Sequence, residues 1–355
     1  MGPGSIGPGL MQPEDRALTL RVAGYLAGAY PLAATYHLAA LEEMAPTLVH
    51  RAGSMVEEET GFSGPGEPSV TVIDRLTWVE RNLAFFTELL RPVEEKLEDH
   101  AEETGLGHRL AGLLMATETG AVLGLLSRRV LGQYELLLPS DGRADQICLP
   151  APNILEMERK FQLRPADFRF WVALHEVTHR LQFVGVPWLR EYFLGLAGGL
   201  VSLSTPEDQS RLEILLSRAG EAIREGSPPV GEAGVLGLMA TPAELEHLDR
   251  VQALMSLVEG HGHVVMDRIG QRQLVTWKRM SDLFTRRRHH PRVAALLRLS
   301  GLEMKLRQYD EGREFILAVE ERAGWAAVNR AWESPETLPT RAEIKAPETW
   351  LARVA

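Results

Sequence analysis

The sequence predicts a mainly α-helical protein with one small β-hairpin. Leucine and alanine recur at three- and four-residue spacing through most of the 355 residues, which is the period of helices that bury one face. Between residues 133 and 150 the pattern changes to two short β-compatible stretches, QYELLLP and QICLPAPNI, around the turn residues SDGRAD. The composition is globular, because 45% of the residues are hydrophobic and 24% are charged.

The first half of the chain is expected to hold three long helices, at 16–45, 74–99 and 108–131. Pro31 bends the first helix, because proline removes a backbone donor. SGPGEPS at 63–69 is a loop, and the glycines of ETGLG at 103–107 end another helix.

The second half is expected to be helical at 152–160, 165–184, 187–204, 206–224, 241–269, 273–285, 291–308 and 310–332. At Thr205–Pro206 and Thr241–Pro242 a capping hydroxyl precedes a proline, which is typical of a helix start. EGSPPVGEAG at 225–234 is the clearest internal break. Trp350 and Leu351 predict that the proline-containing tail packs back on the body.

The charge balance excludes some partners. A net charge of −10 argues against general binding to nucleic acid or to an anionic membrane. The uncharged stretch 22–41 is long enough to span a bilayer, but Pro31, His37 and many alanines favour a buried helix instead. A single cysteine, Cys148, cannot form an internal disulfide, and we expect it to be a buried apolar residue in a cytoplasmic protein.

A metal-binding pattern lies in Trp171–Phe183, WVALHEVTHRLQF, as His175, Glu176 and His179. Histidines four residues apart share one face of a helix, so both can reach one zinc ion. Glu176 is placed to act as general base towards a zinc-activated water. The alternative is a pair of hydrogen-bonded core histidines, since the three-letter pattern is short.

The third metal ligand must come from elsewhere, because the longer H-E-x-x-H-x-x-G-x-x-H pattern does not continue here. The apolar segment 255–267, MSLVEGHGHVVMD, offers Glu259 as ligand. His263 and Asp267 share the face of Glu259 and are expected to orient a ligand or contact the transition state, whereas His261 is a weaker candidate that points elsewhere. The weakest candidates are Glu244, Glu246 and His247.

The hairpin suggests a place for a substrate. Zinc peptidases commonly bind an extended peptide along a strand edge. QICLPAPNI precedes the motif helix, and its prolines are typical of an edge strand. The alternative is that the hairpin is scaffold only.

The chain resembles an uncharacterised family of zincin-like proteins, mainly from actinobacteria and chloroflexi, described as candidate hydrolases or zinc metallopeptidases. The resemblance covers nearly the whole chain, and its most specific pieces are GLLSRRVLGQYELLLP, FWVALHEVTHRLQF, LVEGHGHVVMD and KLRQYDEGREFI. It implies a helical fold with a zincin-like core, one zinc ion, and Glu259 as third ligand by similarity to glutamate-zincins. Those zincins often carry an acid four residues after the ligand glutamate, where this chain has His263.

Three functions follow as hypotheses. The first is a zinc-dependent hydrolase, with a peptidase favoured, acting on a peptide or small-molecule substrate. The second is a non-catalytic binding or assembly protein of zincin fold. The third, which rests on one branch of the family, is a factor linked to biosynthesis of the deazaflavin coenzyme.

The domain organisation is expected to be simple. Residues 1–15 form a flexible segment, of which the first ten need not be native, and residues 16–355 form one domain. The loop at 225–234 allows two lobes, 16–225 with the motif helix and 235–355 with the third-ligand helix.

Overall fold

The computed structural model describes residues 13–98, 106–136, 145–202, 242–288 and 303–354. The chain divides into two compact units. Unit 1 comprises Met1–Met55 and Gly64–Arg180, and unit 2 comprises Val56–Ser63 and Leu181–Ala355. The expected helix at 206–224, the loop at 225–234 and the N-terminal residues up to 12 lie outside the described residues.

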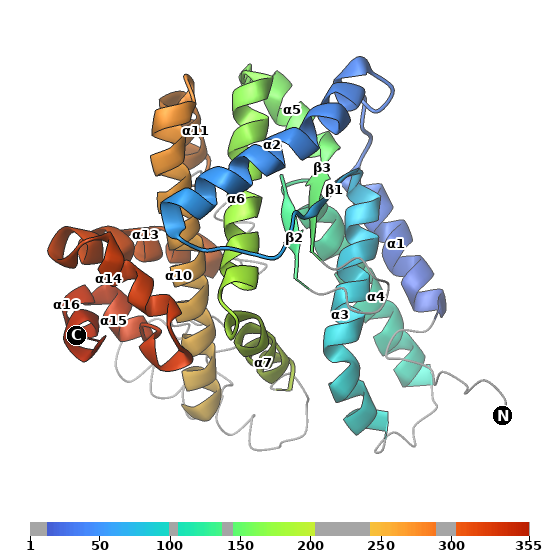
Figure 1. The fold of residues 1–355 in the computed structure, drawn as a ribbon. Coiled ribbons are helices and arrows are strands. Elements are labelled where there is room, and N and C mark those ends of the chain that lie inside the picture. Colours follow the sequence, from blue (N-terminus) through green and yellow to red (C-terminus); the bar gives the residue numbers. More distant parts are fainter. Residues whose placement is uncertain (1–12, 99–105, 137–144, 203–241, 289–302, 355) are drawn as a thin grey trace, which may run out of the picture. The chain divides into compact units, whose positions relative to one another are not determined.

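Unit 1 is built mainly from helices, as the leucine and alanine spacing predicts (Figure 1). They are α1 (Pro13–Ala27), α2 (Tyr36–Thr60), α3 (Arg75–Glu98), α4 (Leu106–Ser127), α5 (Ala151–Phe161) and α6 (Pro165–Gly185). The ends of α2 and α6 belong to unit 2, so both helices run continuously from one unit into the other.

The predicted bent helix at 16–45 is in fact two helices. Gly28, at φ 71°, follows the end of α1, and two overlapping turns, at 30–33 and 32–35, separate α1 from α2. Pro31 lies in the first of these turns. A positive φ suits glycine, and proline cannot donate a helical hydrogen bond, so the chain breaks rather than bends here. None of the described helices has the length and apolar character needed to cross a bilayer.

A three-stranded sheet lies in unit 1, in the order β1-β3-β2. The predicted hairpin is confirmed: β2 (Gln133–Glu135) pairs antiparallel with β3 (Gln146–Pro150), with Tyr134 opposite Ile147. β1 (Ser69–Ile73), which the sequence pattern did not predict, pairs parallel with β3, with Val70 opposite Ile147.

The expectation that QICLP forms an edge strand is therefore wrong. β3 is the central strand, because β1 occupies the side that β2 leaves open. Pro150 is tolerated there because it is the last residue of the strand, where the ladder ends.

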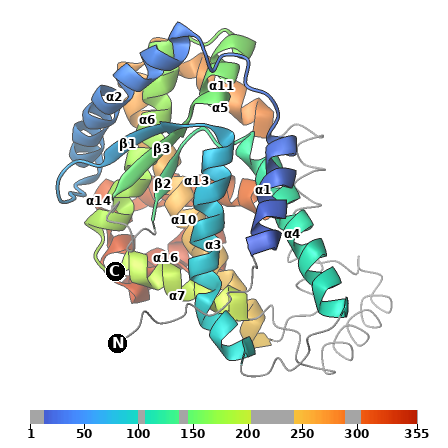
Figure 2. The ribbon, with the colours of Figure 1, turned by 90° about the vertical axis from the view of Figure 1, so that its right-hand side faces the viewer.

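Helices pack closely around this sheet. α1 and α4 lie side by side next to α3 in Figures 1 and 2. A side chain at Gly120 or Gly124 of α4 would collide with the backbone of Thr19 or Ala23 of α1, so the two glycines allow the close crossing. The hydrophobic cluster between helices and sheet includes Ala23, Ile73, Trp78, Val79, Leu83, Leu123 and Cys148.

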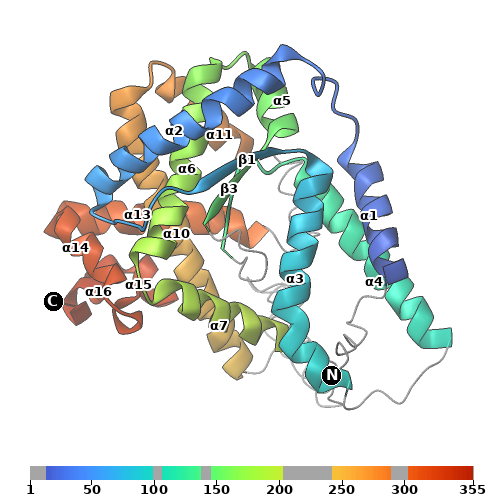
Figure 3. The same ribbon diagram turned by 45° about the vertical axis from the view of Figure 1, so that its right-hand side comes forward.

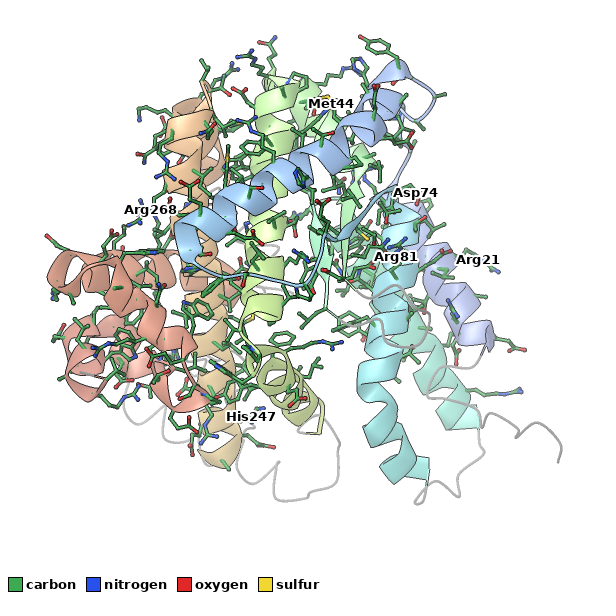
Figure 4. All side chains as sticks on the ribbon, in the orientation of Figure 1. Arg21, Met44, Asp74, Arg81, His247 and Arg268 are labelled. Atoms are coloured by element: carbon green, nitrogen blue, oxygen red, sulfur yellow. The ribbon has the colours of Figure 1, made fainter. Side chains whose placement is uncertain are left out.

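Cys148 is buried, as predicted, and lies in a polar network with Arg81. Arg81 is a residue of α3 and is labelled in Figure 4. The Arg81 guanidinium donates to Cys148 Sγ at 2.9 Å and to Glu135 at 3.1 Å. Burial raises the pKa of the Cys148 thiol well above its ordinary value, and Glu135 adds to the shift. The thiol is therefore protonated at neutral pH and is unsuited to act as a nucleophile.

Unit 2 is also helical, and its main helices are α7 (Leu189–Ser202), α10 (Pro242–Gln273), α11 (Trp277–Arg288) and α13 (Glu303–Ala323). Figure 3 shows α10 beside α7 and α13, in agreement with the contacts between these helices. α10 starts at Pro242, as the Thr-Pro pair predicts. α13 runs through the break that was expected between 308 and 310.

The C-terminal segment closes this unit through α14 (Trp325–Asn329), η1 (Arg330–Trp332), η2 (Pro335–Thr337), α15 (Arg341–Lys345) and α16 (Pro347–Val354). Trp350 is fully buried against Phe315, and its indole N–H donates to the Thr337 carbonyl at 2.8 Å. The tail thus packs on the body, as predicted.

Candidate metal centre

His175 and His179 lie on consecutive turns of α6. The helix starts with Pro165 at its first position and buries Phe168, Phe170 and Leu174, so its apolar residues hold it in the core of unit 1. The two imidazoles are only partly buried. Their Nε2 atoms are 3.2 Å apart, and the rings stand at 81° to each other.

These two histidines belong to a group that suits a metal ion. One potential ligand atom from each of His175, His179 and Glu259 lies within 4.8 Å of the other two. Two nitrogen ligands of a tetrahedral zinc, each at about 2.0–2.1 Å, lie about 3.3 Å apart, close to the observed spacing of the imidazoles. Two histidines and a glutamate are also a ligand set of catalytic zinc, so the residues fit that ion.

Glu176 is buried, with 4% of its surface exposed, and it contacts the β2 strand. Its Oε2 accepts a hydrogen bond from the backbone N–H of Tyr134 at 3.1 Å. Its carboxyl group also lies against Gly132: a Cβ placed on that glycine would be 2.5 Å from Oε1. The backbone N–H of Tyr134 thus helps to hold the carboxylate of the predicted base.

Arg180 ties the motif helix to the start of the sheet. Its guanidinium donates to both carboxylate oxygens of Asp145, at 2.6 and 2.5 Å, and to the Gly66 carbonyl at 2.9 Å. Only 3% of the Arg180 side chain is exposed, whereas the Asp145 side chain is 23% exposed, so the bidentate pair is partly shielded from water. Asp145, at φ 66°, leads directly into β3.

Gln182 connects the end of α6 with α10. Its side-chain nitrogen lies 2.9 Å from the Val258 carbonyl oxygen and 3.0 Å from Nδ1 of His261. Gln182 and His261 are both fully buried. These contacts join the α6 turn that follows His179 to the α10 turn that carries Glu259.

His261 lies in an aromatic environment. Its ring stacks on Trp325 with centroids 5.6 Å apart, and it meets Trp332 at 67° and Phe62 at 37°. His261 contacts Gln182 and these rings, whereas the group of potential metal ligands is completed by Glu259. The position of His261 therefore suits a structural role, in which its packing holds this turn of α10 in place.

The turn of α10 that carries Glu259 also crosses α13 at very short range. A Cβ on Gly260 would overlap the Gly312 backbone, and a Cβ on Gly312 would overlap the Ser256 carbonyl oxygen. Two facing glycines therefore allow the two backbones to touch, which restricts the position of the Glu259 turn.

His263 and Asp267 are placed one and two turns beyond Glu259 on α10. Nε2 of His263 lies 3.7 Å from Asp267, whose carboxylate also accepts from the Trp277 indole at 3.3 Å and lies 3.7 Å from Arg313. Asp267 therefore lies where its charge can favour one orientation of His263.

The weaker candidates on α10 have other contacts. His247 bonds the Leu196 carbonyl at 2.8 Å, and Glu246 pairs with Arg250 on the exposed surface. Within the described parts of the chain, neither of them nor Glu244 belongs to the potential ligand group.

Three residues that hold this site were not among the predicted ones: Gly132, Arg180 and Gln182. Arg180 and Gln182 carried a usable signal, because polar side chains in an apolar helix need buried partners. Gly132 carried no such signal, because a glycine before a strand indicates only a turn. Its close contact with Glu176 depends on the tertiary fold.

Known proteins resemble this chain over nearly its whole length. The sequence profile of the zincin-like metallopeptidase family matches residues 15–351. A crystal structure of a candidate hydrolase with a novel fold from Chloroflexus aurantiacus is 30% identical, with a TM-score of 0.68. The match covers 97% of this chain and 98% of that one. A search of curated proteins finds no match.

Proposed function

Because the chain belongs to the zincin-like metallopeptidase family, we propose that it is a zinc-dependent peptidase. The family and the hydrolase-like structural relative support a metallohydrolase in general terms. The observation that carries the finer proposal is the grouping of His175, His179 and Glu259 beside the buried carboxylate of Glu176.

His175, His179 and Glu259 would hold one zinc ion. When bound, zinc supplies Lewis-acid activation of water and of a substrate carbonyl. The histidines contribute neutral nitrogen ligands and Glu259 contributes one negative charge, which leaves the fourth position of a tetrahedral site for the reactants.

Glu176 performs the proton transfers in the proposed mechanism. Its carboxylate accepts a proton from the attacking water and then donates that proton to the nitrogen of the leaving amine. The backbone N–H of Tyr134 binds Oε2, so the carboxylate keeps one orientation through both transfers. His263, oriented by Asp267, is proposed as a donor to the negative charge that develops on the substrate oxygen.

A peptide substrate would align with β2 rather than with β3. β3 is paired on both sides, whereas β2 forms one edge of the sheet order and contacts Glu176 through Tyr134. An extended peptide that adds to this edge would bring its backbone next to the proposed base.

The test is to replace Glu176 by glutamine and to measure zinc content and peptide hydrolysis together. Glu176→Gln should keep one zinc per chain and lose turnover of a quenched fluorescent peptide library, because glutamine cannot take up the proton. The matched control is Glu58→Gln, at an exposed position of α2, which should retain both.

Full activity of Glu176→Gln would refute the mechanism. A wild-type protein that binds zinc but cleaves no peptide would instead favour a non-catalytic zincin-like protein.

A further inference from the structure

The surroundings of Glu176 assign a role to residues outside the metal-binding motif. We infer that the segment 132–134 positions the base: Gly132 leaves the space that the Glu176 carboxylate occupies, and the Tyr134 N–H fixes its orientation. Gly132 is therefore a positioning residue. The inference rests on the proposed role of Glu176.

Gly132 fits closely against the carboxylate. A Cβ at position 132 would lie 2.5 Å from both Cγ and Oε1 of Glu176 and 2.7 Å from Cδ. Real Cβ atoms do not approach other heavy atoms so closely, so any side chain here displaces the Glu176 carboxyl group.

The backbone at Gly132 does not itself require glycine. Its φ lies outside the left-handed region, unlike that of Gly28, Gly61, Gly66 or Gly324. A φ outside that region is open to alanine. The contact with Glu176 is therefore the physical constraint that favours glycine.

The segment 132–134 is anchored before Gly132 and again at Gln133. The buried side-chain amide of Asn153 donates to the carbonyls of Ser127 and Val130 at 2.7 and 2.6 Å, just before Gly132. Within the segment, Gln133 pairs with Cys148 of β3, and the Trp78 indole donates to the Gln133 side chain at 2.6 Å. Because the backbone is held on both sides of Gly132, a new side chain at 132 should move the end of the Glu176 side chain rather than the backbone.

The two carboxylate oxygens of Glu176 have different neighbours. Oε2 accepts from Tyr134, while Oε1 lies against the Gly132 backbone. A base must present one oxygen at a fixed position to the water it deprotonates, and displacement by about 1 Å can reduce the rate by about 100-fold. The segment acts on this placement through its contacts with Glu176 itself.

The main experiment compares Gly132→Ala with Gly53→Ala. Gly53 lies in α2 with no atom within 4 Å of an added Cβ, so its alanine variant controls for the change in backbone freedom. We expect Gly132→Ala to keep its zinc content and to lose about 100-fold in kcat with little change in KM. Gly53→Ala should retain both constants.

A second measurement reads the contact directly and needs no activity. The chain has six tyrosines, so labelling with 15N-tyrosine gives few backbone amide signals, and Tyr134→Phe identifies the signal of Tyr134. Glu176→Ala removes the acceptor and defines the signal of the unbonded amide. In Gly132→Ala the Tyr134 signal should move to that position, whereas in Gly53→Ala it should stay in place.

The outcomes separate this inference from the proposed function. An unchanged Tyr134 signal in Gly132→Ala overturns the positioning role, and so does unchanged kcat. If the wild type hydrolyses nothing, the proposed function fails, but the amide signal still decides whether the segment holds Glu176. If Gly132→Ala does not fold, Tyr134→Pro tests the same contact. Proline removes the N–H that binds Glu176, and an edge strand such as β2 tolerates proline. Tyr134→Pro should lower kcat without loss of zinc, and an unchanged kcat would refute the positioning role.

Discussion

The Nε2 atoms of His175 and His179 lie 3.2 Å apart, on rings that stand nearly perpendicular to each other. Two neutral imidazoles can share one hydrogen bond at this distance, but the same spacing also lets both lone pairs reach a single ion. Glu259 supplies the third ligand atom within 4.8 Å. A measurement of zinc binding can therefore distinguish a hydrogen-bonded histidine pair from a metal centre.

Zinc should stabilise the protein through these three residues. At a free zinc concentration about 1,000 times Kd, binding stabilises the folded state by about 4 kcal/mol, which differential scanning calorimetry detects as a higher Tm. Glu259→Gln should lose most of this effect. Its control is Glu246→Gln, an exposed residue of the same helix, which should respond to zinc like the wild type. Equal responses of the two variants would argue against Glu259 as a ligand.

Gln182→Met should weaken zinc binding by about tenfold, because the variant loses the contacts with Val258 and His261 that fix the Glu259 turn. Chelator competition measures the affinity. The control is Thr178→Val, which removes a buried 2.7 Å bond to the Leu174 carbonyl within α6 and leaves the contacts to α10 intact. If Thr178→Val weakens zinc binding as much, Gln182 has no special role.

Gly312→Ala should destabilise the fold by about 3 kcal/mol, since its Cβ would overlap the Ser256 carbonyl in the crossing of α10 and α13. Urea denaturation measures the free energy of unfolding. Gly195→Ala, in α7 with no atom within 4 Å of the added Cβ, should be neutral or stabilising by about 1 kcal/mol. A crossing that tolerates alanine at position 312 would contradict the close approach.

Glu343, which lies near the C-terminus, should make the free energy of unfolding depend on pH. Partial burial alone would raise its pKa, but hydrogen bonds from Arg353 and from Thr340 outweigh burial and lower it. A lowered pKa in the folded state means that the stabilisation is present above the unfolded value of about 4.3 and is lost as pH falls through the folded value.

Glu343→Gln should therefore melt at a lower temperature than the wild type at pH 7, and the difference should shrink towards pH 3. A loss of about 1 kcal/mol at pH 7 is expected, because glutamine can still accept from the Thr340 N–H but loses the charge that pairs with Arg353. Exposed Glu348, replaced by glutamine, is the control and should change little at either pH. A difference that persists at pH 3 would show that the lost packing, rather than the charge, matters.

Several features could be predicted from local sequence alone. The period of leucine and alanine predicted most helices to within a few residues, because each helix needs a continuous apolar face. The four-residue spacing of His175 and His179 placed both on one face of α6 before any fold was known. The hairpin was also readable, since its two strands are neighbours in the chain.

Other features depended on contacts between distant segments. β1 was missed because five residues between a loop and a helix give little pattern, and its partner β3 lies more than 70 residues away. The same pairing made β3 a central strand, although its prolines favoured an edge. Gly132 and Gln182 act through Glu176 and Val258, and no spacing rule connects such residues.

The sequence by itself thus determined the helical class and the chemical types of the metal-binding group, because helix period and side-chain chemistry are local properties. The tertiary structure alone decided how the Glu176 carboxylate is held: the backbone of segment 132–134 reaches it through a fold that brings residues more than 40 positions apart into contact. Every residue except proline has a backbone N–H, so the hydrogen bond from the Tyr134 N–H cannot be predicted from the amino-acid pattern.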